Sequence, residues 1–318
     1  MNADQIKTRT RNIEFKGQTS FGINLNGLSD LRFIRANPRL IYSGRANLES
    51  KLNRIEAAFS KLKQQGKPGF IPFITAGDPD LDTTAELLLE LANSGASLIE
   101  LGVPFSDPMA DGPVIQRASE RALQHGFGLE EIFASVAPVR AKIETPIILF
   151  SYFNPLLQYG IDELARAARD AGIDGVLVTD LTPEESKEFA ATLKANDLDM
   201  IFLVAPTSTD ERLRMITAHA SGFVYAVSRA GVTGTRENLS REAELLVARV
   251  RKFSSLPVAV GFGISSPEQV AQTCTYADAA VVGSAIVAQI EELSGSERLV
   301  EQIGLFVRSL IPAGAKTA

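Results

Sequence analysis

The chain has 318 residues, of which 45% are hydrophobic, and its formal net charge is -6. This composition can supply a large core for one or two domains, and the acidic balance argues against a general nucleic-acid surface. The single cysteine, Cys274, excludes an intramolecular disulfide and suits a cytoplasmic protein, and no apolar run approaches the roughly 20 residues of a membrane span.

Residues 1–48 differ from the rest of the chain, because they hold eight Lys or Arg against three Asp or Glu and show poor hydrophobic periodicity. We expect a poorly ordered or loosely packed extension. Two other interpretations stay open: an upstream start codon, and a basic targeting peptide that would make a plastid location possible. Asp4 and Glu14 count against the targeting peptide, and the lack of an apolar segment argues against a secretory signal.

From Leu48 onward the pattern becomes regular. A helical spacing over 50–65 predicts an extra N-terminal helix, which Gly66 and Pro68 end. Eight apolar runs follow and predict strands over 70–76, 97–103, 146–152, 175–180, 200–204, 223–227, 257–260 and 279–282. Helical patterns separate them over 82–93, 112–125, 129–142, 162–171, from 182, 209–218, 241–252, from 266, 285–292 and 297–309.

Eight strand–helix units between residues 49 and 312 predict a (β/α)8 TIM barrel. An open doubly wound sheet is the alternative, but it does not require eight evenly spaced units. The loop after the first strand, Thr75–Asp80, also lacks the glycines of a dinucleotide site. We therefore expect an extension at 1–48, a single catalytic barrel domain at 49–312 and a C-terminal tail at 313–318.

Two carboxylates near the second predicted strand are the leading candidates for chemistry. Glu100 interrupts an apolar strand, where a carboxylate is costly unless it has partners or stays protonated. Asp111 follows in a loop that Pro104 and Pro108 stiffen. Since barrel active sites lie at the carboxyl ends of the strands, both side chains are expected to face one ligand. The other interpretations are a buried ion pair for Glu100 and a turn-capping role for Asp111.

Glycine loops after strands seven and eight suggest a phosphate site. Gly261 and Gly263 flank Phe262, and Gly283 and Ser284 open a short helix. Glycines let backbone N–H groups approach a phosphate, and a helix N-terminus favours its charge. The long Gly/Thr-rich segment 228–236 after strand six is expected to be a mobile lid, or else a solvated loop without a role.

Three other residues that often carry chemistry are given packing roles. His125 and His219 sit at expected helix ends, and Cys274 lies on an amphipathic helix. No Cys/His cluster has the spacing of metal ligands, so no metal site is expected.

Four segments together resemble the tryptophan synthase alpha subunit: Phe70–Pro79, Ile99–Pro113, Ser228–Gly234 and Gly261–Pro267. The resemblance runs in order from about residue 50 to 310 and does not include 1–48. One departure is Ala230, where the family's lid often has a serine. The resemblance implies cleavage of indole-3-glycerol phosphate to indole and glyceraldehyde 3-phosphate in tryptophan biosynthesis, without a cofactor. It also implies an alpha2beta2 complex with a beta subunit that uses pyridoxal phosphate.

The resemblance also implies roles for single residues. Glu100 matches the catalytic acid/base, Asp111 the second catalytic carboxylate and Tyr225 an active-site tyrosine. The implied substrate-binding residues are Phe73, Tyr152, Thr233, Gly234, Phe262, Gly263, Gly283 and Ser284. Three alternatives are a stand-alone indole-releasing lyase, another phosphosugar barrel such as an isomerase, and a non-catalytic activating subunit.

Overall fold

A computed structural model of the chain describes residues 53–227, 236–261 and 263–312. Eight parallel strands form a closed barrel in which strands adjacent in sequence pair with each other, and β1 pairs with β8. The strands are β1 Gly69–Thr75, β2 Ile99–Gly102, β3 Ile147–Ser151, β4 Gly175–Val178, β5 Asp199–Val204, β6 Val224–Val227, β7 Val258–Gly261 and β8 Ala279–Val282. The predicted (β/α)8 barrel is confirmed.

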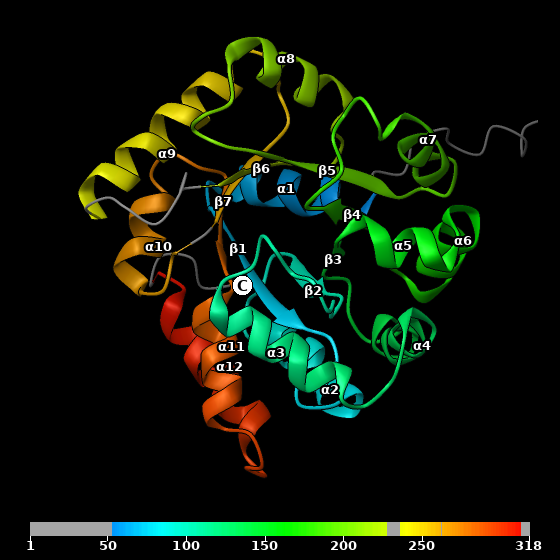
Figure 1. Ribbon diagram of the computed structural model, residues 1–318. Coiled ribbons are helices and arrows are strands. Elements are labelled where there is room, and N and C mark those ends of the chain that lie inside the picture. Colours follow the sequence, from blue (N-terminus) through cyan, green and yellow to red (C-terminus); the bar gives the residue numbers. More distant parts are fainter. Residues whose placement is uncertain (1–52, 228–235, 262, 313–318) are drawn as a thin grey trace, which may run out of the picture. The chain divides into compact units, whose positions relative to one another are not determined.

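Helices surround these strands (Figure 1). They are α1 Arg54–Gln65, α2 Leu81–Asn93, α3 Pro113–Leu123, α4 Leu129–Arg140, α5 Phe153–Tyr159, α6 Ile161–Ala171, α7 Lys187–Ala195, α8 Asp210–His219, α9 Arg236–Val250, α10 Pro267–Thr273, α11 Ser284–Glu292 and α12 Leu299–Leu310. Every strand is followed by at least one helix.

Apolar side chains form two separate cores because residues alternate between the two faces of each strand. Ile74 of β1 and Leu101 of β2 belong to the layer between the strands and the outer helices. Ile71 and Phe73 of β1 belong to the second core, in the barrel interior. Glu100 lies opposite Phe73 in the register of β1 and β2, so its side chain shares the interior.

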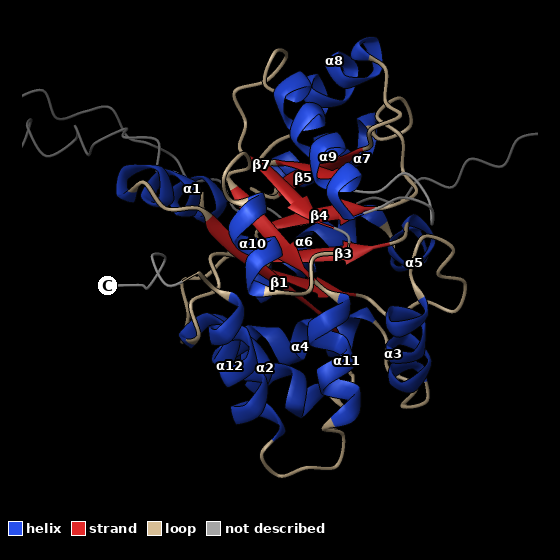
Figure 2. Ribbon diagram, turned by 90° about the vertical axis from the view of Figure 1, so that its left-hand side faces the viewer, coloured by secondary structure: helices blue, strands red, loops and turns tan. Residues whose placement is uncertain are grey.

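The extra N-terminal helix, α1, packs against the interior core. The rings of Phe59 on α1 and Phe223, next to β6, have centroids 5.7 Å apart. Asn53 caps α1 through its side-chain oxygen and donates from Nδ2 to Asp199 at 2.8 Å. Because Phe223 and Asp199 stand at the starts of their strands, α1 covers the amino end of the barrel. Figure 2 shows α1 at that end of the strands, apart from the other helices.

Two helices begin well away from their predicted starts, and one helix was not predicted. Helix α7 begins at Lys187 rather than at Thr182 and Pro183, because those residues start a separate turn in which the Thr182 carbonyl accepts from Glu185 and Ser186. Helix α9 begins at Arg236, five residues before the predicted start. Helix α5 had no counterpart in the sequence pattern.

The predicted N-terminal extension and C-terminal tail, 1–48 and 313–318, lie outside the described residues. Within the described ranges, no helix is both long enough and apolar enough to cross a membrane.

Candidate active site

A cavity of about 250 Å³ opens at the carboxyl ends of the strands. Seven residues that the sequence predicted for the site line it, from five strands or the segments after them: Phe73, Glu100, Asp111, Tyr225, Gly263, Gly283 and Ser284. The two predicted carboxylates therefore face one shared space, which also reaches both glycine loops.

Glu100 holds an almost fully buried carboxyl group in this cavity. Strand β2 places it between Phe73 of β1 and Ile148 of β3, and its side chain is only 1% exposed. Its Oε1 atom has no hydrogen-bond partner among the described residues. Burial raises the pKa of Glu100 to about 8, because desolvation disfavours the carboxylate. Glu100 is thus a carboxylic acid that keeps its proton at neutral pH.

Asp111 occupies the loop between β2 and α3, immediately before Gly112 and the first helical residue, Pro113. Its Oδ2 accepts a hydrogen bond from the Tyr152 hydroxyl at 3.1 Å, and that hydroxyl accepts from the Ala110 N–H at 2.8 Å. Burial raises the pKa of Asp111 to about 6, while the Tyr152 hydrogen bond opposes the rise. Between about pH 6 and 8 the cavity therefore holds one neutral acid and one carboxylate.

Tyr225 lies in the barrel interior on β6 and is buried. A side chain at Gly261 would start 2.1 Å from the Tyr225 hydroxyl, so the glycine on β7 leaves the room that the phenol occupies. Burial first, and then the charge of Glu100, raises the pKa of Tyr225 well above its ordinary value. The phenol therefore stays neutral and adds no negative charge next to Glu100.

A further part of the cavity lining comes from glycine backbone and a helix start. Gly263 has a positive φ of 88°, a conformation that favours glycine. Gly283 is the N-cap of α11 and Ser284 is its first residue. The first N–H groups of a helix have no acceptor within the helix, and the helix dipole favours an anion there. This wall is suited to a phosphate group.

A small annex of about 10 Å³ adjoins the main cavity and is lined by Thr75, Asp111 and Tyr152. The buried Thr75 hydroxyl has no hydrogen-bond partner in the described structure. Thr75 could have been assigned to the site from the sequence, because it ends a strand whose alternate residues face the barrel interior. Sequence reasoning did not assign three further lining residues, Ile115, Phe150 and Val281, because apolar side chains at strand ends and in a first helical turn look like ordinary core.

Three predicted substrate-binding residues, Thr233, Gly234 and Phe262, lie outside the described residues, as does most of the predicted lid. His125 contacts the Pro79 carbonyl and His219 that of Met215, so both rings are engaged in helix-end contacts away from the cavity. In the described part of the chain, no group of three or more His, Cys, Asp or Glu side chains could hold a metal ion.

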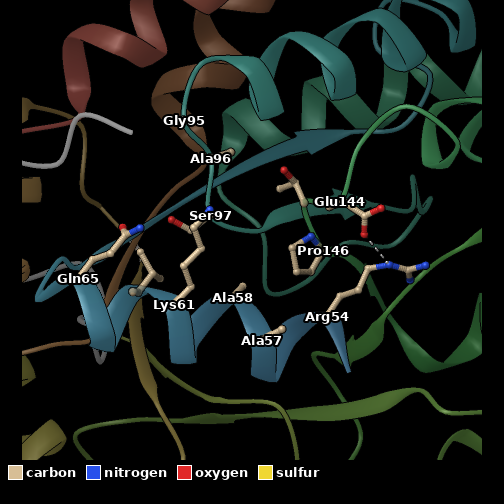
Figure 3. A pocket seen from close by; sticks show the side chains of 12 residues that line it. Arg54, Ala57, Ala58, Lys61, Gln65, Gly95, Ala96, Ser97, Glu144 and Pro146 are labelled. Carbon is tan, nitrogen blue, oxygen red and sulfur yellow. Dashed lines mark ion pairs between the residues drawn. The ribbon is translucent and has the colours of Figure 1, made fainter. Parts of the chain in front are cut away.

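A second cavity, of about 330 Å³, lies between α1 and the segments that precede β2 and β3 (Figure 3). Its charged groups include Arg54 and Glu144, which pair with each other at 3.7 Å. Glu144 is 97% exposed, so its carboxylate is hydrated rather than desolvated. This cavity is larger than the one around Glu100, but the acid in its lining is exposed to solvent rather than desolvated.

Comparison with known proteins agrees with this geometry. A family profile described as "Tryptophan synthase alpha chain" matches residues 59–312. The tryptophan synthase alpha chain of Geotalea uraniireducens is 49% identical over 265 residues, which cover 83% of this chain and 98% of that one.

Solved structures are also similar. Tryptophan synthase subunit alpha of Legionella pneumophila matches with a TM-score of 0.76 and 39% identity, covering 81% of this chain and 97% of that one. A structure described as the tryptophan synthase a2b2 complex of Pyrococcus furiosus matches with a TM-score of 0.70 and 41% identity, covering 76% of this chain and 97% of that one. By both sequence and fold, the chain belongs to the tryptophan synthase alpha chain family.

Proposed function

We propose that this chain is a carbon–carbon lyase that cleaves indole-3-glycerol phosphate to indole and glyceraldehyde 3-phosphate by a retro-aldol reaction. The family is a lyase family of tryptophan biosynthesis. The observation that carries the proposal is the pairing of a buried, protonated Glu100 with an ionised Asp111 in one cavity that ends at the N-terminus of α11.

Protonation of the indole ring is the first step. Indole is a poor carbanion leaving group, so C3 must gain a proton as, or before, the bond to the glycerol carbon breaks. Glu100 donates this proton, and its raised pKa supports the role because the carboxyl group is still protonated near pH 7. The new C3–H bond leaves a positive charge on the indole nitrogen.

Asp111 stabilises that charge by accepting a hydrogen bond from the indole N–H. Its hydrogen bond from Tyr152 supports the role, since the tyrosine holds the carboxylate in place and favours its ionised form. The Glu100 carboxylate formed in the first step then removes the proton of the hydroxyl group next to the breaking bond. The electrons of the C3–C bond return to the ring, and the hydroxyl carbon becomes the aldehyde of the second product.

The remaining residues bind the substrate. The rings of Phe73 and Phe150 pack edge to face with their centroids 5.3 Å apart. They offer an apolar wall for the indole ring. The backbone at Gly263, Gly283 and Ser284 holds the phosphate. On the basis of family resemblance we extend this role to Gly234 and assign Thr233 and Phe262 to the substrate site without a phosphate contact. Each reaction step uses side chains of this chain alone, so we infer that no cofactor is needed.

We further infer that the chain works in an alpha2beta2 complex, with pyridoxal phosphate confined to the beta subunit. The description of the Pyrococcus furiosus relative as an a2b2 complex supports this partner. Two apolar side chains near the mouth of the barrel offer contact area: Met109 in the loop before α3 is 88% exposed, and Leu157 on α5 is 51% exposed. Both residues lie in segments that follow strands, at the carboxyl end of the barrel, and we place the partner surface there.

Indole release from indole-3-glycerol phosphate by the purified chain tests the activity directly. We expect Glu100→Gln and Asp111→Asn each to lower kcat by about 10²-fold or more while circular dichroism reports an intact fold. Glu144→Gln, at the other end of the barrel, is the matched control and should keep wild-type turnover. Lack of indole release would favour the isomerase or activating-subunit alternatives, and near wild-type turnover in either acid variant would remove the assigned mechanism.

A further inference from the structure

One guanidinium group outside the cavity connects three of the elements that build it. Arg121, near the end of α3, donates from Nε and Nη2 to the two carboxylate oxygens of Asp78, both at 2.8 Å. Its Nη1 donates to Glu291, on the last turns of α11, at 2.7 Å. Asp78 belongs to the loop between β1 and α2. A single side chain therefore joins that loop to α3 and α11.

Both helices contribute to the wall of the cavity, and the loop continues a strand that does. Helix α3 begins directly after Asp111 and Gly112, and α11 begins at Ser284. The loop that holds Asp78 continues β1, which carries Phe73. On α3 and α11, the contacts of Arg121 thus lie at the helix ends away from the cavity, whereas Asp78 follows shortly after Phe73. Helices are stiff over such lengths, so fixing their far ends also constrains their starts.

The contact with Asp78 is specific and buried. Asp78 is 2% exposed, and within the described ranges Arg121 is the basic side chain that pairs with it. The two parallel hydrogen bonds form the bidentate geometry that arginine provides and lysine cannot reproduce. Without Arg121 a buried carboxylate would be left uncompensated, so the β1 loop would have to rearrange.

Arg117 offers a natural comparison. It lies one helical turn before Arg121 on α3 and donates to both oxygens of Glu291, at 2.8 and 2.7 Å. These hydrogen bonds are the main reason that the pKa of Glu291 is lowered to about 2. Glu291 is therefore ionised at any working pH. Arg117 is about half exposed and is not paired with Asp78. It connects α3 to α11 at the surface but does not reach the β1 loop.

We propose that Arg121 is a positioning residue: it holds α3 and α11 against the β1 loop, so that Asp111 and the phosphate-binding end of α11 meet the same substrate. The inference rests on the proposed function, because it assigns the phosphate to α11 and the indole nitrogen to Asp111. Arg121 itself touches no substrate. Its effect is transmitted through the two helices.

Two variants separate the contacts of Arg121. Arg121→Lys keeps a positive charge near Asp78 but cannot bridge Asp78 and Glu291 with a planar guanidinium. Glu291→Gln leaves the Arg121–Asp78 pair in place and weakens the contacts of both Arg121 and Arg117 with α11, so its effect is read against that of Arg117→Met. The control is Arg117→Met, which removes the surface contact alone. Two quantities are measured at a temperature where all variants are folded: the Kd of inorganic phosphate and the kcat and KM of indole release.

We expect Arg121→Lys to weaken phosphate binding by about 10-fold and to lower kcat by about 10- to 100-fold, because a misplacement of about 1 Å is costly in a reacting site. Glu291→Gln should weaken phosphate binding in the same direction, whereas Arg117→Met should stay within about twofold of wild type. The pH limbs of kcat/KM should not move in Arg121→Lys, because the titrating groups are unchanged and only the plateau falls.

A purely structural role for Arg121 would lower the thermal stability and leave phosphate Kd, kcat and KM at wild-type values, and that result would overturn the inference. An equal loss of phosphate affinity in Arg117→Met would also contradict the inference. The effect would then come from any lost contact between α3 and α11 and would not be specific to Arg121. If wild-type protein released no indole, the proposed function would fail instead, while the phosphate measurements would still test the role of Arg121.

Discussion

Burial alone does not distinguish the proposed acid from other carboxyl groups of the barrel. Asp174 and Asp199 are also buried, but Asp174 pairs with Arg54 and Arg140, and Asp199 accepts from Asn53. Glu100 has an oxygen without such a partner among the described residues. An unpartnered carboxyl group is destabilising for the fold, so its presence in a ligand-sized cavity is best explained by chemistry.

The pKa values of the two carboxyl groups predict a bell-shaped pH profile. Asp111 must be ionised, so kcat/KM should rise with pH through about 6, and Glu100 must be protonated, so it should fall as pH rises through about 8. The measurement is indole release across pH 5–10 at low substrate concentration. Residual activity of Asp111→Asn should lose the acidic limb and keep the alkaline one. If both limbs of the pH profile persisted in this variant, the lower pKa would belong to another group.

At the scale of elements, α1 illustrates a helix that serves stability rather than catalysis. Its Ile55 and Phe59 belong to the interior core, yet they enter the barrel from its amino end. In barrels of this class the amino end contributes stability and the carboxyl end contributes the active site. The cavity around Glu100 contains no residue of α1. The contacts of α1 should therefore affect unfolding without affecting turnover.

Truncation of one α1 side chain tests this separation. We expect Phe59→Ala to lower the free energy of unfolding by about 3–5 kcal/mol, because it opens a cavity against Phe223. Below the unfolding transition, kcat should stay within about twofold of wild type. Leu305→Ala is the control, since Leu305 is 53% exposed on α12 and its truncation should cost less than about 0.5 kcal/mol. Denaturant unfolding and indole release are the two measurements, and a large loss of kcat in Phe59→Ala would contradict the separation.

Helix α5 shows why an element can be missed in a sequence. It has only seven residues, with Pro155 in its first turn, and its first N–H, that of Phe153, donates to Asp180 at 2.7 Å. Asp180 follows the next strand, β4, so the cap comes from 27 residues away. Local pattern alone cannot reveal a helix that a distant side chain caps.

At the scale of the whole molecule, the proposed partner surface gives a prediction of its own. We expect Met109→Asp and Leu157→Asp to weaken binding of the beta subunit by about 10-fold or more, because each buries a charge in an apolar contact. Indole release by the isolated chain should change little. Leu245→Asp is the control, because Leu245 is 57% exposed on α9. Titration calorimetry with the beta subunit measures the affinities, and wild-type affinity in both variants would move the interface elsewhere.

The repeating pattern of the sequence was sufficient to determine the barrel and the candidate carboxylates. Eight apolar runs separated by helical periodicity leave few ways to bury all strands, and an acid within such a run stands out without coordinates. Closure of β1 on β8 agrees with the barrel that eight such units predict. These features depend on local periodicity, which the order of residues contains directly.

Tertiary structure alone decided which side chains meet. The sequence could not show that Tyr152 holds Asp111, that Gly261 makes room for Tyr225, or that Arg121 contacts both Asp78 and Glu291, which lies 170 residues after it. Each contact joins residues distant in sequence, and its existence depends on side-chain directions and on distances of about 3 Å. Periodicity determines which face of an element is buried, but only the packed barrel determines what that face touches.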